Sequence, residues 1–444
     1  MGLTESLGLF VSGLKPQDVP GEAVATVRRG MADCVGVAFA SVNEPVLAHA
    51  SATVDSGTSG EARLWTHGRY AAAGDAAFVN AIAGHALDFD DTGLDGHPSV
   101  VLAPVVLAEA EHLNRPWMAA VTAYVAGYEV WAELVSRDAD KHHAKGWHPT
   151  AVFGTVACAA ASAWLRQLPA KQVSQALGIA ASMAGGLVAN FGSMTKPLQV
   201  GFAARNGILA AQLAQRGVTA TADALESPRG FLAALSPAGR VRLDGPSRAG
   251  QPWQILLQGL NIKRYPACYA SHRIIDAALS LQGQLAGRTS DIEEVVAELG
   301  ELQAAMLRSS RPSSALDAKF SAEFVIACAL ARRHVDLRDL TDERVNDADV
   351  QQLLRKVRVI PMPERDHEEP LFSPADHLTV RLRDGATIRA EPVRRALGHA
   401  SHPVGDDELR EKFSACAGIA LDARSVDAWW RAAMAEPDQK VRWP

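Results

Sequence analysis

Apolar residues recur every three to four positions along most of the first 260 residues, which is the period of an α-helix with one buried face. In residues 21–41, for example, Val24, Val27 and Met31 keep this spacing, and Arg28 falls on the other face. Alternation of apolar and polar residues, which is typical of strands, is almost absent here. The pattern predicts an all-α region with helices at residues 21–41, 76–87, 100–111, 117–135, 151–165, 173–189, 200–217 and 222–235.

The pattern changes after residue 260. Residues 292–299 and 357–361 lack a helical period and are predicted to be strands, whereas residues 318–333 are helical. Residues 377–382 alternate between apolar and polar positions, and the Asp384-Gly385 turn that follows predicts a hairpin. This mixture predicts a smaller α+β domain.

The last 50 residues are helical again. From residue 406 the apolar positions, among them Phe413 and Trp429, return to helical spacing and need a surface to cover. We expect the large helical region to provide that surface. The chain is therefore predicted to form an all-α domain from residues 1–259 and 395–444, with an α+β domain of residues 260–394 between them.

The composition agrees with a division into two domains and limits the classes of partner that the protein can have. A length of 444 residues exceeds one ordinary core. The net charge of -6 is mild and argues against a nucleic acid or a membrane surface as the main partner. The five cysteines are widely spaced and form no C-x-x-C pair, which predicts buried, reduced thiols. The N-terminus does not resemble a secretory signal and no apolar stretch is long enough to span a membrane, so we expect a cytoplasmic protein.

Three of the predicted helices begin in the same way. His97, His148 and Lys196 each precede a proline and then an apolar run. Proline disfavours the α conformation in the residue before it and suits the first helical turn, so all three side chains are predicted at helix N-termini. One such pair is commonly only a helix start, but three together indicate a pocket for a carboxylate or phosphate. We expect the helix dipole to lower the histidine pKa values and to favour neutral imidazoles.

A cluster of acids precedes the first of these helix starts. Asp88, Asp91 and Thr92 lie within ten residues of His97 and are flanked by apolar sequence. A solvated loop after a helix is the alternative explanation. With His85 these residue types permit a metal site, but the adjacent His-Asp pair typical of Asp/His phosphohydrolases is missing, and the mixture suits a hard cation only weakly. We therefore expect no metal at this cluster. P-loop and Rossmann motifs are also absent from the sequence.

The junction between the two sequence patterns carries a further group. Lys263, Arg264 and Tyr265 place two cations and a hydroxyl there. Ligands commonly bind in clefts between domains, which favours a substrate-binding role. A solvated edge is the alternative for the two cations.

Together these segments resemble the MmgE/PrpD family, which includes 2-methylcitrate dehydratases, cis-aconitate decarboxylases and iminodisuccinate epimerases. The resemblance covers nearly the whole chain, in family order. The spacing between Asp88 and His97 is more similar to the decarboxylase and epimerase branches than to the methylcitrate dehydratases. The matching segments are Gly84-His-Ala-Leu-Asp-Phe-Asp-Asp-Thr92 with His97-Pro98-Ser99, Gly146-Trp-His-Pro-Thr150, Ser193-Met-Thr-Lys-Pro-Leu-Gln-Val-Gly-Phe-Ala-Ala-Arg-Asn206, Ile262-Lys-Arg-Tyr-Pro266 and Ala318-Lys-Phe-Ser321.

The resemblance implies a mainly α fold, in which a helical domain made from both chain ends carries an inserted α+β lid domain. It also implies a homodimer and cofactor-independent lyase chemistry on a small polycarboxylate. By matched position, the residues implied to line the pocket are Asp88, Thr92, His97, His148, Lys196 and Lys263. We add Asp91, Arg264 and Tyr265 as neighbouring candidates for substrate binding.

The reactions of this family share one chemical problem, the movement of a proton on a carbon next to a carboxylate. Fixed cations that face this carboxylate stabilise the charge that develops on it. We expect Lys196 and Lys263 to bind substrate carboxylates, His97 and His148 to move the proton, and Asp88 to orient or charge one histidine. A lyase, either a dehydratase or a decarboxylase, is the preferred function. An epimerase of an imino- or amino-dicarboxylate is the alternative, and a non-catalytic anion-binding protein is the third reading.

Overall fold

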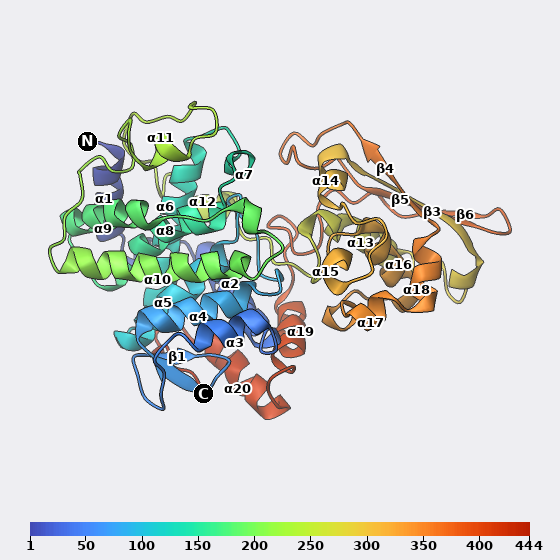
Figure 1. Ribbon diagram of the computed structural model, residues 1–444, viewed down its shortest axis with the longest axis horizontal. Helices are drawn as coiled ribbons and strands as arrows, with labels where there is room; N and C mark the ends of the chain where they lie inside the picture. The colour runs from blue at the N-terminus through green and yellow to red at the C-terminus, as the bar shows by residue number, and fades with distance from the viewer. The chain divides into compact units, whose positions relative to one another are not determined.

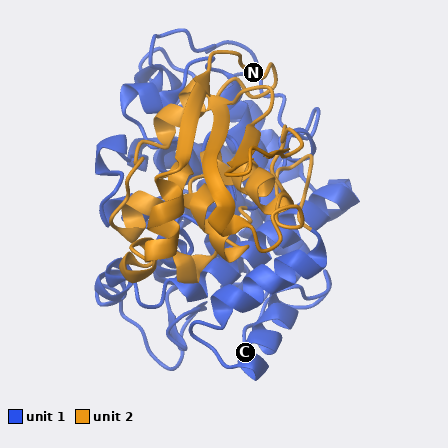
Figure 2. Ribbon diagram, turned by 90° about the vertical axis from the view of Figure 1, so that its right-hand side faces the viewer, with its two compact units in different colours: residues 1–262, 405–444 blue, residues 263–404 orange.

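The computed structural model describes residues 1–444 and is mainly α-helical, as predicted (Figure 1). The chain divides into two compact units (Figure 2). Unit 1 comprises Met1–Ile262 and Gly405–Pro444, and unit 2 comprises Lys263–Val404.

Unit 1 is built from helices, with one short hairpin of β1 (Ala62–Leu64) and β2 (Arg69–Ala71). The central helix α8 is buried along almost its whole length, as its uncharged, alanine-rich sequence predicts. The helices are α1 (Leu3–Gly13), α2 (Gly21–Ala40), α3 (Pro45–Ser51), α4 (Ala73–His85), α5 (Pro98–His112), α6 (Trp117–Ser136), α7 (His142–Lys145), α8 (Pro149–Leu165), α9 (Ala170–Met183), α10 (Thr195–Gln215), α11 (Phe231–Leu235), α12 (Gln254–Leu257), α19 (Asp406–Ala417) and α20 (Ala423–Ala433).

Two predicted helices are shorter than their apolar patterns indicated. α9 ends at Met183, because the chain then passes through Gly186, whose φ of 149° is accessible in practice only to glycine. The helix predicted at residues 222–235 is reduced to α11, because Pro228 and Gly230 interrupt it. Both errors have the same origin, since an apolar period continues through residues that cannot extend a helix.

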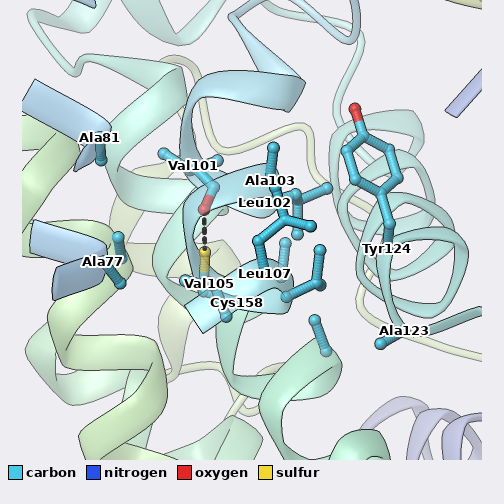
Figure 3. Close-up of a cluster of buried hydrophobic side chains, with 14 of the residues drawn as sticks. Ala77, Ala81, Val101, Leu102, Ala103, Val105, Leu107, Ala123, Tyr124 and Cys158 are labelled. Carbon is cyan, nitrogen blue, oxygen red and sulfur yellow. Dashed lines mark hydrogen bonds between the residues drawn. The ribbon is translucent and has the colours of Figure 1, made fainter. Parts of the chain in front are cut away.

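Close helix packing determines the shape of the core of unit 1. A Cβ atom added to Gly207 of α10 would lie 2.3 Å from Cys158 Cβ of α8, so only glycine permits this approach. Figure 3 shows part of this core, where side chains of α5 lie between those of α4 and α6. The Cys158 thiol donates a hydrogen bond to the Val101 carbonyl there, at 3.5 Å. All five cysteines are buried and free, in agreement with the prediction.

The C-terminal helices lie on unit 1. α19 packs against α2, and Phe413 and Trp429 are buried in the same core. The Trp429 ring meets Phe39 of α2 edge to face, with ring centroids 4.7 Å apart. No single helix of the chain is long and apolar enough to cross a membrane, and α2 and α3 meet that criterion only as a pair bent by 97°.

Unit 2 contains a four-stranded sheet in the order β4-β3-β5-β6. The predicted strands and hairpin are confirmed: β3 (Ile292–Gly300) runs parallel to β4 (Val357–Met362) and antiparallel to β5 (His377–Leu382), which pairs with β6 (Thr387–Arg389). α13 contacts β5, α16 contacts β4 and the two helices contact each other, so they cover one face of the sheet. The helices of unit 2 are α13 (His272–Ser280), α14 (Glu301–Met306), α15 (Ala315–Ala318), α16 (Ala322–Arg332), α17 (Asp342–Val345) and α18 (Ala348–Leu354).

Candidate active site

The acid cluster lies in the loop between α4 and α5, and this loop is held by backbone hydrogen bonds. Thr92 and Asn261 exchange two bonds of 3.0 and 2.9 Å, and Gly93 and Gly96 exchange two more of 2.9 and 2.8 Å. Asp88 has a φ of 55°, a left-handed conformation that aspartate tolerates better than most residues. These bonds fix the backbone of the loop, and with it the positions from which its side chains project.

The three predicted helix starts converge on this loop. His97 and His148 are the N-cap residues of α5 and α8, and Lys196 lies in the first turn of α10, as expected. α10 packs against both α4 and α8, and α5 also packs against α8. The packing of these helices brings together residues that are more than 100 positions apart in the sequence.

Asp88, His97 and Lys196 form the accessible part of the site. The Lys196 ammonium donates a hydrogen bond to Asp88 Oδ1 at 2.7 Å, and the same oxygen lies 3.8 Å from His97 Nε2. The three side chains are 15 to 24% exposed, so a small ligand can reach them. Asp88 thus lies between a fixed cation and an imidazole; its pairing with Lys196 was not predicted from the sequence.

A second group, His85 and Asp90, lies fully buried behind His97. His85 Nδ1 is 3.0 Å from both oxygens of Asp90, and His97 Nδ1 is 2.9 Å from Asp90 Oδ2, at an angle too bent for a strong hydrogen bond. Burial opposes ionisation of Asp90, but the two imidazoles hold its pKa well below the usual range. Burial lowers the pKa of His85 to about 4, against the raising effect of Asp90. At neutral pH the group is therefore a carboxylate facing a neutral imidazole.

His148 is also buried, and it has its own partner. Gln199 Oε1 lies 2.7 Å from His148 Nδ1, and the Gln199 amide donates to the Leu187 carbonyl at 3.1 Å. The Phe191 ring meets the imidazole edge to face, with centroids 4.8 Å apart. Burial, followed by the charge effect of His85, lowers the pKa of His148 to about 2. The ring is neutral, as expected, but the main cause is burial and not the helix dipole that we had predicted.

The three imidazoles form one cluster. The His85 ring centroid lies 4.7 Å from that of His97 and 6.1 Å from that of His148. Sequence reasoning placed His97 and His148 in the site, considered His85 only as a metal ligand, and gave no role to Asp90, Gln199 or Phe191. A weak signal existed for His85 and Gln199, since Gln199 follows Lys196 by three positions on α10 and His85 ends the apolar helix α4.

Asp91, for which the sequence predicts substrate binding, forms hydrogen bonds inside unit 1. It is buried, and its carboxylate accepts a hydrogen bond from the Ser99 amide at 3.1 Å and another from the Ser99 hydroxyl. That hydroxyl also lies 2.8 Å from the Tyr124 hydroxyl. These bonds tie the loop to the first turn of α5, which argues for a structural role. Thr92 is a better candidate for ligand contact, because its buried hydroxyl has no partner.

The remaining three candidates belong to unit 2. Lys263 is buried and Arg264 is half-buried. The Tyr265 hydroxyl donates to Asp276 Oδ1 at 2.6 Å, and Asp276 also accepts from the Leu397 amide. The phenol is therefore used inside unit 2, which supports a structural role for Tyr265 and leaves the two cations as the candidates for substrate binding.

Four residues of the site have donor atoms grouped as a metal site would require. The ligand atoms of His85, Asp88, Asp90 and His97 all lie within 4.8 Å of one another. However, Lys196 already compensates the charge of Asp88, and both oxygens of Asp90 face imidazole nitrogens. The charge of Asp88 is thus paired with Lys196, and the oxygens of Asp90 are occupied by contacts with the two imidazoles.

Comparison with known proteins identifies the family. The MmgE/PrpD N-terminal domain matches residues 5–244, and the MmgE/PrpD C-terminal domain matches residues 265–433. The chain belongs to the MmgE/PrpD family. It is 30% identical to the cis-aconitate decarboxylase of Homo sapiens, over 96% of this chain and 90% of that protein. The Mus musculus enzyme of the same name is also 30% identical, over 96% and 89%, and that of Aspergillus terreus is 26% identical, over 96% and 91%. These similarities confirm the prediction of a lyase.

Proposed function

We propose that this MmgE/PrpD lyase decarboxylates cis-aconitate or a closely related tricarboxylate without a cofactor. The observation that carries the proposal is the cluster of Asp88, His97 and Lys196, a fixed cation and an imidazole within reach of a small anion. The relatives named cis-aconitate decarboxylases span nearly the whole chain, which supports this substrate class.

The chemistry explains why such a cluster is needed. When a carboxylate leaves as carbon dioxide, the carbon–carbon bond breaks and its electron pair stays on the substrate. In an unsaturated tricarboxylate this pair is delocalised through the alkene toward a second carboxylate, and a carbon then takes up one proton. Lys196 would stabilise the charge that develops on this second carboxylate, and we assign Lys263 and Arg264 to the binding of the other two. Thr92 would donate or accept one further hydrogen bond.

Proton transfer is assigned to His97 and His148. His97 is accessible and lies beside Asp88, so it is the candidate for direct transfer to carbon. His148 lies beneath Phe191 and is neutral, so we assign it to hydrogen bonding with substrate or to a second proton transfer. From the family resemblance we also propose that residues 263–404 act as a lid domain and that the enzyme is a homodimer. The sequence pattern favours a cytoplasmic location.

Turnover in deuterium oxide tests the proposal. With cis-aconitate, we expect one carbon dioxide and one incorporated deuterium for each substrate consumed. H97Q and H148Q should each lower kcat by about 100-fold or more, since general acid–base catalysis contributes about 100- to 10,000-fold. H112Q, at the opposite end of α5 from His97, is the matched control and should keep the wild-type rate.

The other outcomes separate the rival functions. Deuterium incorporated into a dicarboxylate without release of carbon dioxide would indicate an epimerase instead. Thermal stabilisation by tricarboxylates without any turnover would indicate a binding protein. Near-normal rates in both H97Q and H148Q would refute the assignment of the histidines even if the substrate were correct.

A further inference from the structure

Asp90 is the one carboxylate of the site that is fully buried and that faces two imidazoles. Each imidazole presents the same atom to it, since Nδ1 of His85 and Nδ1 of His97 both lie within 3.0 Å of its oxygens. The side chain of Asp90 is 0% exposed, whereas that of His97 is 15% exposed. The contact with Asp90 is therefore made on the inner side of His97.

The charge of Asp90 decides which nitrogens carry hydrogen. An ionised carboxylate only accepts hydrogen bonds and repels a nitrogen lone pair at 2.9 to 3.0 Å. The nitrogen that faces it must therefore carry the hydrogen, also at His97, where the contact is bent. His85 and His97 are then both protonated at Nδ1. In each ring Nε2 is left as the nitrogen whose proton can change.

We propose that Asp90 is a positioning residue that fixes the Nδ1–H of His97, so that Nε2 gains and loses the proton of the reaction. This inference rests on the proposed role of His97 in proton transfer. Nε2 of His97 is the nitrogen that lies 3.8 Å from Asp88 Oδ1, and this oxygen binds Lys196. The reactive nitrogen thus lies beside the proposed carboxylate-binding cation.

His85 restrains the Asp90 carboxylate. Its Nδ1 lies at equal distances from both carboxylate oxygens, which opposes rotation of the carboxylate about its last bond. The backbone beside Asp90 is restrained as well, because the Lys412 ammonium donates to the Phe89 carbonyl at 2.9 Å. Asp90 is thereby held from two sides while it orients His97.

Nitrogen NMR of the histidine side chains tests the inference in the wild-type enzyme. The chain is labelled with ¹⁵N-histidine, and the His97 signals are assigned by their loss in H97Q. We expect a protonated Nδ1 in His97 in the active enzyme, while the signal of Nε2 changes when a tricarboxylate binds. A protonated Nε2 with an unprotonated Nδ1 would overturn the inference.

A variant series gives the kinetic test. D90N preserves shape but offers an amide that donates from one side, so it no longer fixes the same tautomer. We expect kcat to fall by about 100-fold or more with KM changed less than threefold, by analogy with the loss of the orienting carboxylate in other acid–base dyads. D95N is the matched control, because Asp95 lies in the same loop but pairs with the exposed Lys141. It should keep wild-type kcat and KM.

The outcomes distinguish this inference from the proposed function. An inactive H97Q with a fully active D90N would refute the positioning role of Asp90 and leave the role of His97 intact. An active H97Q would refute the proton-transfer role of His97 itself. If D90N does not fold, the wild-type NMR measurement still decides the tautomer.

Discussion

At the scale of single residues, the site combines accessible charged groups with buried partners that orient them. Gln199 is the clearest example after Asp90, because its carbonyl faces His148 Nδ1 while its amide is fixed by the Leu187 carbonyl. An amide oriented in this way accepts a hydrogen bond from Nδ1, which leaves the lone pair of His148 on Nε2. The side chain therefore selects one tautomer of a neutral, buried imidazole.

Replacing this residue should affect catalysis more than folding. In Q199L the His148 ring loses its acceptor and both tautomers become accessible, so we expect kcat to fall by about tenfold or more. Q215L is the control, since Gln215 lies at the exposed end of the same helix, where its side-chain carbonyl accepts a hydrogen bond from Arg166. Steady-state kinetics of the two variants at pH 7 makes the comparison. Equal kcat values for Q199L and Q215L would exclude a role for Gln199 in setting the tautomer.

The sequence predicted the charged residues of the site better than their partners. His97, His148 and Lys196 carry a local signal, because a proline fixes each of them at a helix start. Gln199 and His85 carry only the weak signal of their positions on α10 and α4, which does not separate them from other polar residues on helices. Their contacts depend on how α4, α8 and α10 pack, and that geometry follows from close approaches such as the one at Gly207. The burial of Asp91 was equally invisible, since it cannot be read from a position in an acid cluster.

At the scale of elements, the C-terminal helix α19 supports the catalytic loop. The Lys412 ammonium forms an ion pair with Asp33 of α2 at 2.6 Å, donates to the Phe89 carbonyl and lies 4.0 Å from the Phe89 ring centroid. The side chains of Lys412 and Asp33 are both almost fully buried. Loss of one partner would leave the other as an uncompensated charge in the core, which is costly.

K412M should therefore destabilise unit 1 by about 3–5 kcal/mol and also reduce turnover, because the backbone between Asp88 and Asp90 loses its anchor. All nine tryptophans of the chain lie in unit 1, so their fluorescence during urea unfolding reports on this unit alone. R410M is the control on the same helix. Arg410 pairs with Asp427 on the surface, and such pairs contribute about 0–1 kcal/mol. A stability loss below that of R410M would show that the Asp33–Lys412 pair is not important for the fold.

At the scale of the whole molecule, the buried titratable groups make stability depend on pH, and they act in opposite directions. His85 and His148 have pKa values lowered mainly by burial, so the unfolded chain binds more protons and stability rises with pH up to about 6.5. Burial raises the pKa of Asp91 to about 8, against the lowering effect of Ser99, and that of Asp376 to about 6. For these two acids the native state binds more protons than the unfolded chain. Their contribution to the stability of the folded state is therefore lost as pH rises through the folded pKa.

Between pH 6.5 and 8 the histidines of the unfolded chain lose their protons, and Asp376 has already lost most of its own. Asp91 therefore dominates the change of unfolding free energy with pH in this window. Wild-type stability should fall across this window, because each proton retained only by the native state costs about 1.4 kcal/mol per pH unit. D91N carries no titrating group at this position, so its stability relative to wild type should improve by about 1.5 kcal/mol from pH 6.5 to 8. Urea unfolding of both proteins, followed by tryptophan fluorescence at pH 6.5, 7.0, 7.5 and 8.0, measures the difference. A difference that stays constant with pH would show that Asp91 does not titrate in this range, and that its carboxylate is ionised in the core at neutral pH.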